Sequence, residues 1–315
     1  MLVITESDPE LPPPPLELIP ADVEVVAVGA TPTDEQLAAA QVVYIWDHRF
    51  ADLGSLLRRA PKVRWVHAAS VGVNRLLCPE IHDVVLTNSR GVFDIPIAEW
   101  VMAAVLSHTK GFTESWALQR EHRWRHRMTG RLAGTRAAVV GTGSIGRAIA
   151  ERLMRLDVDV TLVGRAAATD PQFGTVRASA DLVLVAAEVD LLVLAAPLTT
   201  ATTALVGAEV LTALGPNGFL VNVGRGPTVV ETDLVDALHA GTIAGAALDV
   251  FEVEPLPEES CLWSMPNVFV SPHMSGDYIG FEGDMMAMFT SNLTRWLRGE
   301  PLHNIVDPTV GYVPS

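Results

Sequence analysis

Short apolar runs alternate with segments of helical character along most of the 315-residue chain. The runs are rich in β-branched residues and lack strict apolar–polar alternation, which is typical of parallel strands covered on both faces. The predicted strands are Val23–Val28, Val42–Ile45, Val63–His67, Val84–Thr87, Ala137–Val140, Val158–Val163, Leu191–Ala195, Gly218–Val223, Ala244–Leu248 and Val268–Ser271. Helices are predicted over Asp34–Ala40, Ile145–Leu156, Glu231–Ala240 and Asp284–Arg298. This alternation predicts an α/β fold with mainly parallel sheets.

A long and largely apolar segment suggests where two such α/β units join. Asp94–Lys110 is predicted to be a helix, with Pro96 near its start, where proline is tolerated. A basic and aromatic stretch follows, and then Gly130 and Gly134, as in a connection between domains. The run Pro12–Pro15 is expected to be a stiff exposed loop.

Composition and charge narrow the classes of function. Hydrophobic residues make up 49% of the chain, and the formal net charge is −15 with a pI near 4.9. A chain this acidic repels phosphate backbones, which argues against nucleic-acid binding. The short basic stretch Arg120–Arg127 is therefore interpreted as a solvated or interface segment in which Trp124 packs.

The two cysteines and the apolar stretches bear on the compartment. Cys78 and Cys261 lie far apart and fit neither a disulfide framework nor a metal cluster, so no metal is predicted and a reducing, cytoplasmic location is expected. The first residues, MLVITESDPE, lack the pattern of a signal peptide. The most apolar stretch, Leu182–Leu198, contains two acidic residues, so no membrane span is expected.

A glycine-rich turn lies between a predicted strand and a predicted helix. Gly141, Gly143 and Gly146 form the pattern GxGxxG in Gly141-Thr142-Gly143-Ser144-Ile145-Gly146. In this context the glycines allow a tight turn, a close approach of the backbone to a pyrophosphate, and close helix–strand packing. The N–H groups at the start of the helix then hold the phosphates. The pattern predicts dinucleotide binding, although methyltransferases use similar turns.

The end of the next strand bears on the choice of dinucleotide. NAD sites usually place an acidic residue about 20 residues after the glycine-rich turn, where it binds the ribose hydroxyls. Here the strand ends in Gly164-Arg165, and Asp159 lies near its start. Gly164 leaves space and Arg165 offers a guanidinium suited to a 2′-phosphate. The cofactor is therefore expected to be NADP in preference to NAD; the alternative is that Arg165 is a solvated loop residue.

Three further segments, read together, resemble a known family. They are Asn222-Val223-Gly224-Arg225-Gly226, Leu248–Leu256 (LDVFEVEPL) and Ser271-Pro272-His273-Met274-Ser275-Gly276. With the glycine-rich turn and the strand end Ala195–Thr199, they resemble the D-isomer-specific 2-hydroxyacid dehydrogenases over nearly the whole chain. Trp46, Arg165 and the segment 254–263 are most similar to the glyoxylate/hydroxypyruvate reductase branch. The resemblance implies hydride transfer between NAD(P)H and a small 2-keto acid or D-2-hydroxy acid.

The chemistry of a 2-keto acid suits three residues of these segments. Arg225 can bind the carboxylate and the adjacent carbonyl with its planar fork of donors. His273 would donate a proton to the carbonyl oxygen and accept it in the reverse reaction. Glu254, paired with His273, would favour the imidazolium and fix the orientation of the ring. All three are expected at the carboxyl ends of strands.

Further contacts follow from the resemblance alone. Val71 and Gly72, in the loop Ser70–Val73, would offer backbone N–H groups to the substrate carboxylate, and Trp46 would line the substrate pocket unless it is simply a core aromatic. Asp249 would meet the nicotinamide carboxamide. The other expected cofactor contacts are Gly141, Gly143, Ser144, Ile145, Gly146, Gly164, Arg165, Pro197, Val223, Gly224, His273 and Ser275.

The expected architecture is two Rossmann-like domains, one of them flavodoxin-like, with an active site in the cleft between them. Residues 94–275 would bind the dinucleotide, and residues 1–93 and 276–315 would form a discontinuous substrate-binding domain. The resemblance also implies a homodimer. Two alternatives stay open: a phosphite or formate dehydrogenase on the same scaffold, although Glu254 argues against the formate branch, and a dinucleotide-sensing corepressor with the same fold.

Overall fold

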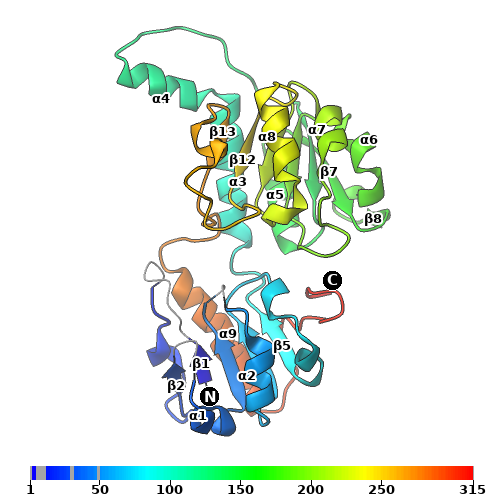
Figure 1. Cartoon of the computed structure of the whole chain (residues 1–315). Coiled ribbons are helices and arrows are strands. Elements are labelled where there is room, and N and C mark those ends of the chain that lie inside the picture. The colour runs from blue at the N-terminus through cyan, green and yellow to red at the C-terminus, as the bar shows by residue number, and fades with distance from the viewer. Residues whose placement is uncertain (1, 5–11, 29–31, 48–49, 315) are drawn as a thin grey trace. The chain divides into compact units, whose positions relative to one another are not determined.

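The computed structural model describes residues 2–4, 12–28, 32–47 and 50–314. The chain forms two compact units, shown in Figure 1. Unit 1 comprises Met1–Phe93 and Tyr278–Ser315, and unit 2 is the continuous segment Asp94–Asp277. The assignment of substrate binding to the first unit and dinucleotide binding to the second stays a prediction, as does the cleft between them.

Unit 1 is built on a five-stranded parallel sheet. Its strands are β1 (Leu2–Ile4), β2 (Val26–Val28), β3 (Val42–Ile45), β4 (Trp65–Ala68) and β5 (Val85–Asn88), and its α-helices are α1 (Asp34–Ala39), α2 (Leu53–Arg59) and α9 (Phe281–Leu297). The spatial order is β2-β1-β3-β4-β5 with every pair parallel. This is the order of flavodoxin-like sheets.

The two faces of this sheet are covered by different kinds of side chain. Aliphatic residues of α1 and α2 pack on one face, with Leu37 and Leu53 fully buried. On the other face Phe289 of α9 stacks on Tyr44 with the ring centroids 4.3 Å apart, and Trp65 lies 5.4 Å from the same ring. The fully buried His67 contacts this stack and completes an aromatic layer beneath α9.

Unit 2 contains an eight-stranded sheet. Its strands are β6 (Arg136–Val140), β7 (Asp159–Gly164), β8 (Ala168–Asp170), β9 (Gly174–Ala178), β10 (Leu191–Leu194), β11 (Phe219–Asn222), β12 (Gly245–Leu248) and β13 (Val268–Val270). The helices are α3 (Asp94–Thr109), α4 (Phe112–Arg120), α5 (Ser144–Arg155), α6 (Leu182–Ala186), α7 (Ala208–Leu214) and α8 (Glu231–His239). The order is β13-β12-β11-β10-β6-β7-β9-β8, and only the edge strand β8 runs antiparallel to its neighbour.

The apolar runs become the central strands of this sheet because helices cover both faces. Residues of β6, β10, β11 and β12 form one core with α6, α7 and α8. Helices α3 and α5 pack against each other, and they contact β11 and β6, respectively. The strand order places the reversal of winding between β6 and β10, and ligands of doubly wound sheets bind at this point.

The predicted fold class is confirmed, and the differences lie in short elements. The strand predicted over Val23–Val28 is extended only at Val26–Val28, and the helix predicted from Asp284 begins at Phe281. The hairpin of β8 and β9 was not predicted, because β8 has three residues and two of them are exposed and polar or small. Within the described part of the chain, no helix has the length and apolar character needed to cross a bilayer.

Candidate active site

Five strands of unit 2 end in register at one edge of the sheet. Val140, Leu194, Asn222, Leu248 and Val270 are the last residues of β6, β10, β11, β12 and β13, and neighbouring members of this set are paired across the sheet. The glycine-rich turn, Pro197, Arg225, Glu254 and His273 all follow these strand ends in sequence. The topology therefore brings most of the predicted cofactor and catalytic residues to the edge where such sheets bind ligands.

The glycine-rich turn has room for a phosphate group. A Cβ atom at Gly146 would lie 1.9 Å from the carbonyl oxygen of Gly141, so only glycine lets α5 approach the turn this closely. At Gly143, the residue before α5, a Cβ would meet nothing within 4 Å. The first N–H groups of α5 have no partner within the helix. The turn therefore fits a pyrophosphate at the helix N-terminus.

One side chain of the turn is already engaged in the protein. The hydroxyl of Ser144 donates to Oδ1 of Asp94 at a distance of 2.9 Å and so ties the start of α5 to the start of α3. This contact uses the hydroxyl proton, so a contact from Ser144 to a phosphate would come from its backbone N–H. The backbone of Ile145 occupies the next position of the same helical turn.

The end of β7 is closely packed at Gly164 and carries a cation at Arg165. A Cβ at Gly164 would lie 3.1 Å from Cγ1 of Val176 and 3.2 Å from Cγ2 of Thr142, so a larger residue would crowd this corner. Arg165 follows directly and is exposed. Asp159 is the first residue of β7 and pairs with Arg136 of β6, at the opposite end of the strand from Arg165. The residues at this strand end fit a phosphorylated ribose.

A nearby carboxylate that the sequence did not single out is held by an arginine of α5. Asp170, the last residue of β8, forms an ion pair with Arg147, and the hydrogen bond from Arg147 is the main reason that the pKa of Asp170 falls to about 2. Its Oδ1 accepts the N–H groups of Gln172 and Phe173 at 2.9 and 3.1 Å. Asp170 therefore stays ionised and stabilises the hairpin next to β7.

Glu254 and His273 form a direct pair. Oε2 of Glu254 lies 2.9 Å from Nδ1 of His273, and the two side chains are 26% and 33% exposed. Burial alone would raise the pKa of Glu254. The hydrogen bond from His273, the charges of His273 and Arg225, and the N–H of Phe251 at 3.0 Å together lower it below its usual value. An ionised carboxylate only accepts hydrogen bonds, so Nδ1 of His273 carries a proton.

Arg225 lies in the loop that follows β11, next to this pair. A Cβ at Gly226 would lie 1.9 Å from the backbone of Phe251, so the absence of a side chain lets the Arg225 loop pack directly on the loop that carries Glu254. Nη1 of Arg225 donates to the carbonyl of Gly224 at 2.6 Å. The Arg225 loop and the Glu254 loop are therefore in direct contact, and the charge of Arg225 contributes to the lowered pKa of Glu254.

The Arg225 loop is itself fixed by a residue to which the sequence analysis gave no role. Asn222 is almost fully buried at the end of β11. Its amide donates to the carbonyl of Arg225 at 3.1 Å and its Oδ1 accepts the N–H of Gly224 at 3.1 Å. The hydroxyl of Thr228 also donates to the Arg225 carbonyl, at 2.6 Å. Asn222 lies within a quoted motif, and its burial after an apolar strand could have revealed this role.

The predicted substrate contacts of unit 1 lie after β3 and β4. The amide of Asn88 donates to the carbonyl of Val71 and the hydroxyl of Ser70 donates to that of Gly72, at 2.7 and 2.8 Å. Within the described part of the chain, the N–H groups of Val71 and Gly72 donate to no backbone carbonyl. Trp46 is buried and donates its indole N–H to the carbonyl of Pro12 at 3.0 Å. Residues 48 and 49, which follow Trp46 closely in sequence, lie outside the described residues.

The remaining cofactor predictions also lie at the carboxyl edge of unit 2. Val223 is buried directly after β11, and the carbonyl of Pro197 accepts the hydroxyl of Thr202 at 2.7 Å. The N–H of Ser275 donates to Oδ2 of Asp249 at 3.0 Å. These contacts are all within the protein, so the cofactor roles of the three residues stay predictions.

One expectation from the sequence is wrong. Trp124 does not pack: its side chain is fully exposed, on the extended segment after α4. Figure 1 shows α4 and this segment standing away from the sheet of unit 2. The indole therefore covers nothing within its own unit.

The chain is similar to known proteins of one family over most of its length. The sequence model of the NAD-binding domain of the D-isomer specific 2-hydroxyacid dehydrogenases matches residues 102–275. The hydroxyphenylpyruvate reductase of Plectranthus scutellarioides is 33% identical over 253 residues, which are 78% of this chain and 79% of that protein. The glyoxylate/hydroxypyruvate reductase B of Pectobacterium carotovorum is 33% identical over 264 residues, which are 81% of this chain and 82% of the relative.

A solved structure extends the similarity to nearly the whole chain. The NADPH-dependent glyoxylate/hydroxypyruvate reductase of Sinorhizobium meliloti, crystallised with NADP and sulfate, matches with a TM-score of 0.85 and 28% sequence identity. The match covers 99% of this chain and 99% of that chain. The similarity therefore includes both units.

Proposed function

Because the chain belongs to the D-isomer-specific 2-hydroxyacid dehydrogenase family, we propose that it reduces a small 2-keto acid to the D-2-hydroxy acid with NADPH, as glyoxylate/hydroxypyruvate reductases do. The observation that carries the proposal is the 2.9 Å pair of Glu254 and His273 beside the charge of Arg225, at the carboxyl edge of a Rossmann sheet. These three groups supply the anion binding and the proton that the reaction needs.

Each group has one task in the proposed reaction. The guanidinium of Arg225 binds the substrate carboxylate and the keto oxygen, which orients the carbonyl carbon. We assign proton transfer to Nε2 of His273, the ring nitrogen that does not face Glu254. Glu254 keeps a proton on Nδ1 and stabilises the positive ring before the proton leaves Nε2. NADPH, when bound, supplies the hydride to the carbonyl carbon.

The residues present fit this cofactor. The open turn at Gly143 and the N-terminus of α5 would hold the pyrophosphate. Gly164 and Arg165 would hold the phosphorylated ribose, so NADP is preferred over NAD. The relative from Sinorhizobium meliloti, which was crystallised with NADP, supports the same preference.

The substrate is proposed by chemistry and by the names of the relatives. The compounds in the names of the hydroxyphenylpyruvate reductase and the glyoxylate/hydroxypyruvate reductase B all have a carboxylate next to a carbonyl group. The backbone N–H groups of Val71 and Gly72 would hold that carboxylate. The test is a panel of glyoxylate, hydroxypyruvate, pyruvate and phenylpyruvate, each with NADPH and with NADH. Turnover of at least one keto acid, faster with NADPH, is expected. Binding of NADPH without turnover of any keto acid would overturn the enzyme assignment and favour a dinucleotide sensor.

We also propose that the chain forms a homodimer through an arm made of α4 and residues 121–131. Trp124 and Met128 are 100% and 95% exposed on this arm, and Trp116 and Phe112 are half-exposed on α4. Single apolar residues on a surface are common, but four large ones on one projecting segment indicate an interface. The arm carries five arginines and two glutamates, whereas the whole chain has a net charge of −15. A second copy of this acidic chain is therefore an electrostatically complementary partner.

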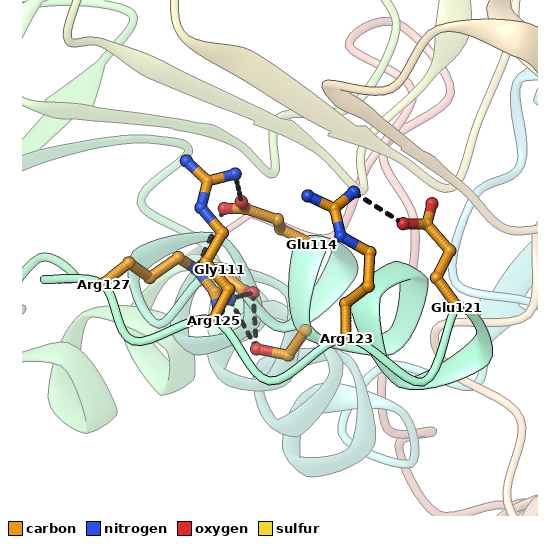
Figure 2. Close-up of polar contacts among 7 residues, drawn as sticks. Gly111, Glu114, Glu121, Arg123, Arg125 and Arg127 are labelled. Atoms are coloured by element: carbon orange, nitrogen blue, oxygen red, sulfur yellow. Dashed lines mark hydrogen bonds and ion pairs between the residues drawn. The ribbon is translucent and has the colours of Figure 1, made fainter.

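Ion pairs and hydrogen bonds within the arm hold the segment after α4 against this helix, as Figure 2 shows. Arg125 and Arg127 reach back to Glu114 of α4 at 3.2 and 2.9 Å, and Arg127 donates to the carbonyl of Gly111 at 2.6 Å. Arg123 pairs with Glu121 at 2.9 Å. Because the chain as a whole has a net charge of −15 and repels phosphate backbones, we propose a protein interface here and no nucleic-acid contact. Cys78 and Cys261 are free thiols, which is consistent with a proposed cytoplasmic location.

A further inference from the structure

We propose that Asp249 is a positioning residue whose buried carboxylate holds the His273 loop in its reactive conformation. The proposal rests on the proposed function, because it gives His273 the proton-transfer role. The resemblance to the family suggested only that Asp249 meets the nicotinamide carboxamide. The contacts of its carboxylate point to a role within the protein that does not depend on the cofactor.

The carboxylate of Asp249 is directed at the loop that carries His273. Asp249 follows β12 and is 1% exposed. Its Oδ1 accepts the hydroxyl of Ser271 and the N–H of Met274, the latter at 2.9 Å. Its Oδ2 accepts the N–H of Ser275 at 3.0 Å. The donors thus come from both sides of His273, two residues before it and one and two residues after it.

The backbone of His273 needs such support. Its φ is +53°, in the left-handed region that side chains other than glycine rarely adopt. Conformations of this kind persist where surrounding contacts over-determine them. The N–H of His273 donates to the backbone carbonyl of Asp249 at 2.8 Å, so one residue binds the N–H of His273 and of both following residues. A single residue, Asp249, therefore fixes the backbone of the His273 loop through its side chain and its backbone carbonyl.

The pairing of His273 with Glu254 depends on this loop conformation. The imidazole reaches Oε2 of Glu254 at 2.9 Å from this left-handed backbone conformation of residue 273. A carboxylate can accept at about four lone-pair sites, and three donors already use this one. An amide at the same position would keep one acceptor oxygen and turn an NH2 group toward a backbone N–H donor. The loop would then lose at least one hydrogen bond and gain a donor–donor clash.

The variant Asp249→Asn separates positioning from cofactor binding. Asn keeps an oxygen that could accept a hydrogen bond from a carboxamide, so the dissociation constant of NADPH, measured by fluorescence without substrate, should change less than about threefold. The kcat for keto-acid reduction should fall about 100-fold, the usual cost of misplacing a reacting group by about 1 Å. The pH profile of kcat/KM should shift, because the imidazole no longer faces Glu254. Ser271→Ala removes one of the three donors and should give a smaller loss of the same kind.

Controls keep the test interpretable. Asp236→Asn makes the same change of charge on the exposed face of α8 and should behave as the wild type. If Asp249→Asn does not fold, Ser271→Ala still tests the positioning role. An unchanged pH profile with NADPH binding weakened more than tenfold would overturn the proposal in favour of the carboxamide role. If the wild-type chain turns over no keto acid, the proposed function fails instead, and NADPH binding by both variants still reports on the carboxamide contact.

Discussion

Glu254 and His273 lie nineteen residues apart in sequence, yet Oε2 of the first is 2.9 Å from Nδ1 of the second. The contact joins the loops that follow β12 and β13, which are neighbouring strands of the unit 2 sheet. It orients Nδ1 of the ring toward Glu254. The proposed proton transfer to the substrate is therefore assigned to Nε2, the other nitrogen of the imidazole.

Removal of the imidazole should abolish proton transfer and leave cofactor binding intact. For His273→Ala we expect kcat to fall by about 10²–10⁴-fold, the typical contribution of a general acid. The dissociation constant of NADPH, measured by fluorescence titration, should stay near the wild-type value. His239→Ala, at the exposed end of α8, is the matched control. Near-normal kcat in His273→Ala would exclude the assigned role.

Arg225 should act mainly on the keto acid. Arg225→Lys keeps the charge but loses the planar fork of donors that matches a carboxylate and an adjacent carbonyl. We expect KM for the keto acid to rise and kcat to fall, with kcat/KM lower by about 10²-fold, since charged hydrogen bonds contribute about 1.5–3 kcal/mol. Steady-state kinetics at saturating NADPH measure this. A kcat/KM equal to that of the wild type would contradict the role.

Arg165 should distinguish the two dinucleotides. Arg165→Ala removes a cation at the end of β7 where the 2′-phosphate is expected. The dissociation constant of NADPH should rise about tenfold or more, whereas that of NADH should hardly change. Arg155→Ala, in the last turn of α5, is a control for the loss of a positive charge. Equal effects on both dinucleotides would remove Arg165 from the explanation of cofactor preference.

The buried His67 should make the free energy of unfolding smaller in acid. Burial lowers the pKa of His67 to about 3 in the folded chain, whereas the unfolded chain titrates near 6.5. The folded state therefore excludes a proton that the unfolded state binds below pH 6.5, and stability is lost as the pH falls from about 6.5 toward 3. One pKa unit corresponds to about 1.4 kcal/mol, so about 2 kcal/mol should disappear between pH 6.5 and pH 5.

The loss can be assigned to His67 by substitution and urea unfolding. Nδ1 of His67 is hydrogen-bonded to the hydroxyl of Thr87 at 2.7 Å. The indole N–H of Trp65 donates to the same hydroxyl at 2.8 Å. His67→Gln keeps a polar group in this network but does not titrate. It should be less stable at pH 7 and show a smaller fall in the free energy of unfolding between pH 7 and pH 5. The same fall in both proteins would assign the acid sensitivity elsewhere.

The arm should control the oligomeric state. Substitution of Trp124 and Met128 together by serine removes the two most exposed apolar side chains of the arm. We expect the dimer to dissociate at least about tenfold more readily, because central aromatic residues dominate interfaces. Sedimentation of both proteins over a range of concentrations measures this. Substitution of the exposed Ile279 by serine is the control, since that residue lies outside the arm. A monomeric wild-type chain would refute the proposed homodimer.

The sequence predicted most strands of both sheets, because apolar runs rich in β-branched residues leave little choice of strand position. The order of motifs also predicted which strand ends meet at one edge of unit 2. The β8–β9 hairpin escaped prediction because its stability depends on Asp170 and Arg147, which only the folded chain brings together. The environment of Trp124 was predicted wrongly, since a sequence pattern does not distinguish an aromatic that packs from one that is presented to solvent.

The loop role of Asp249 could not be predicted from the sequence either. The carboxylate of Asp249 accepts hydrogen bonds from two backbone N–H groups. Every residue other than proline has such a group, so these partners cannot be recognised from the sequence. The same holds for Asn222, whose partners are the backbone of Gly224 and Arg225. Residues that act through side chains were identifiable, whereas those that hold the backbone of the site required coordinates.

Unit 2 is an uninterrupted segment set between the two pieces of unit 1, and it contains Arg225, Glu254 and His273 together with the glycine-rich turn. The groups proposed to move the proton and those proposed to hold the hydride donor thus share a single stretch of polypeptide. Mutation in the outer pieces, which are predicted to bind the substrate, should alter which acid is accepted without disturbing this stretch. In such an arrangement the substrate preference can change in one part of the chain while the other part is inherited unchanged.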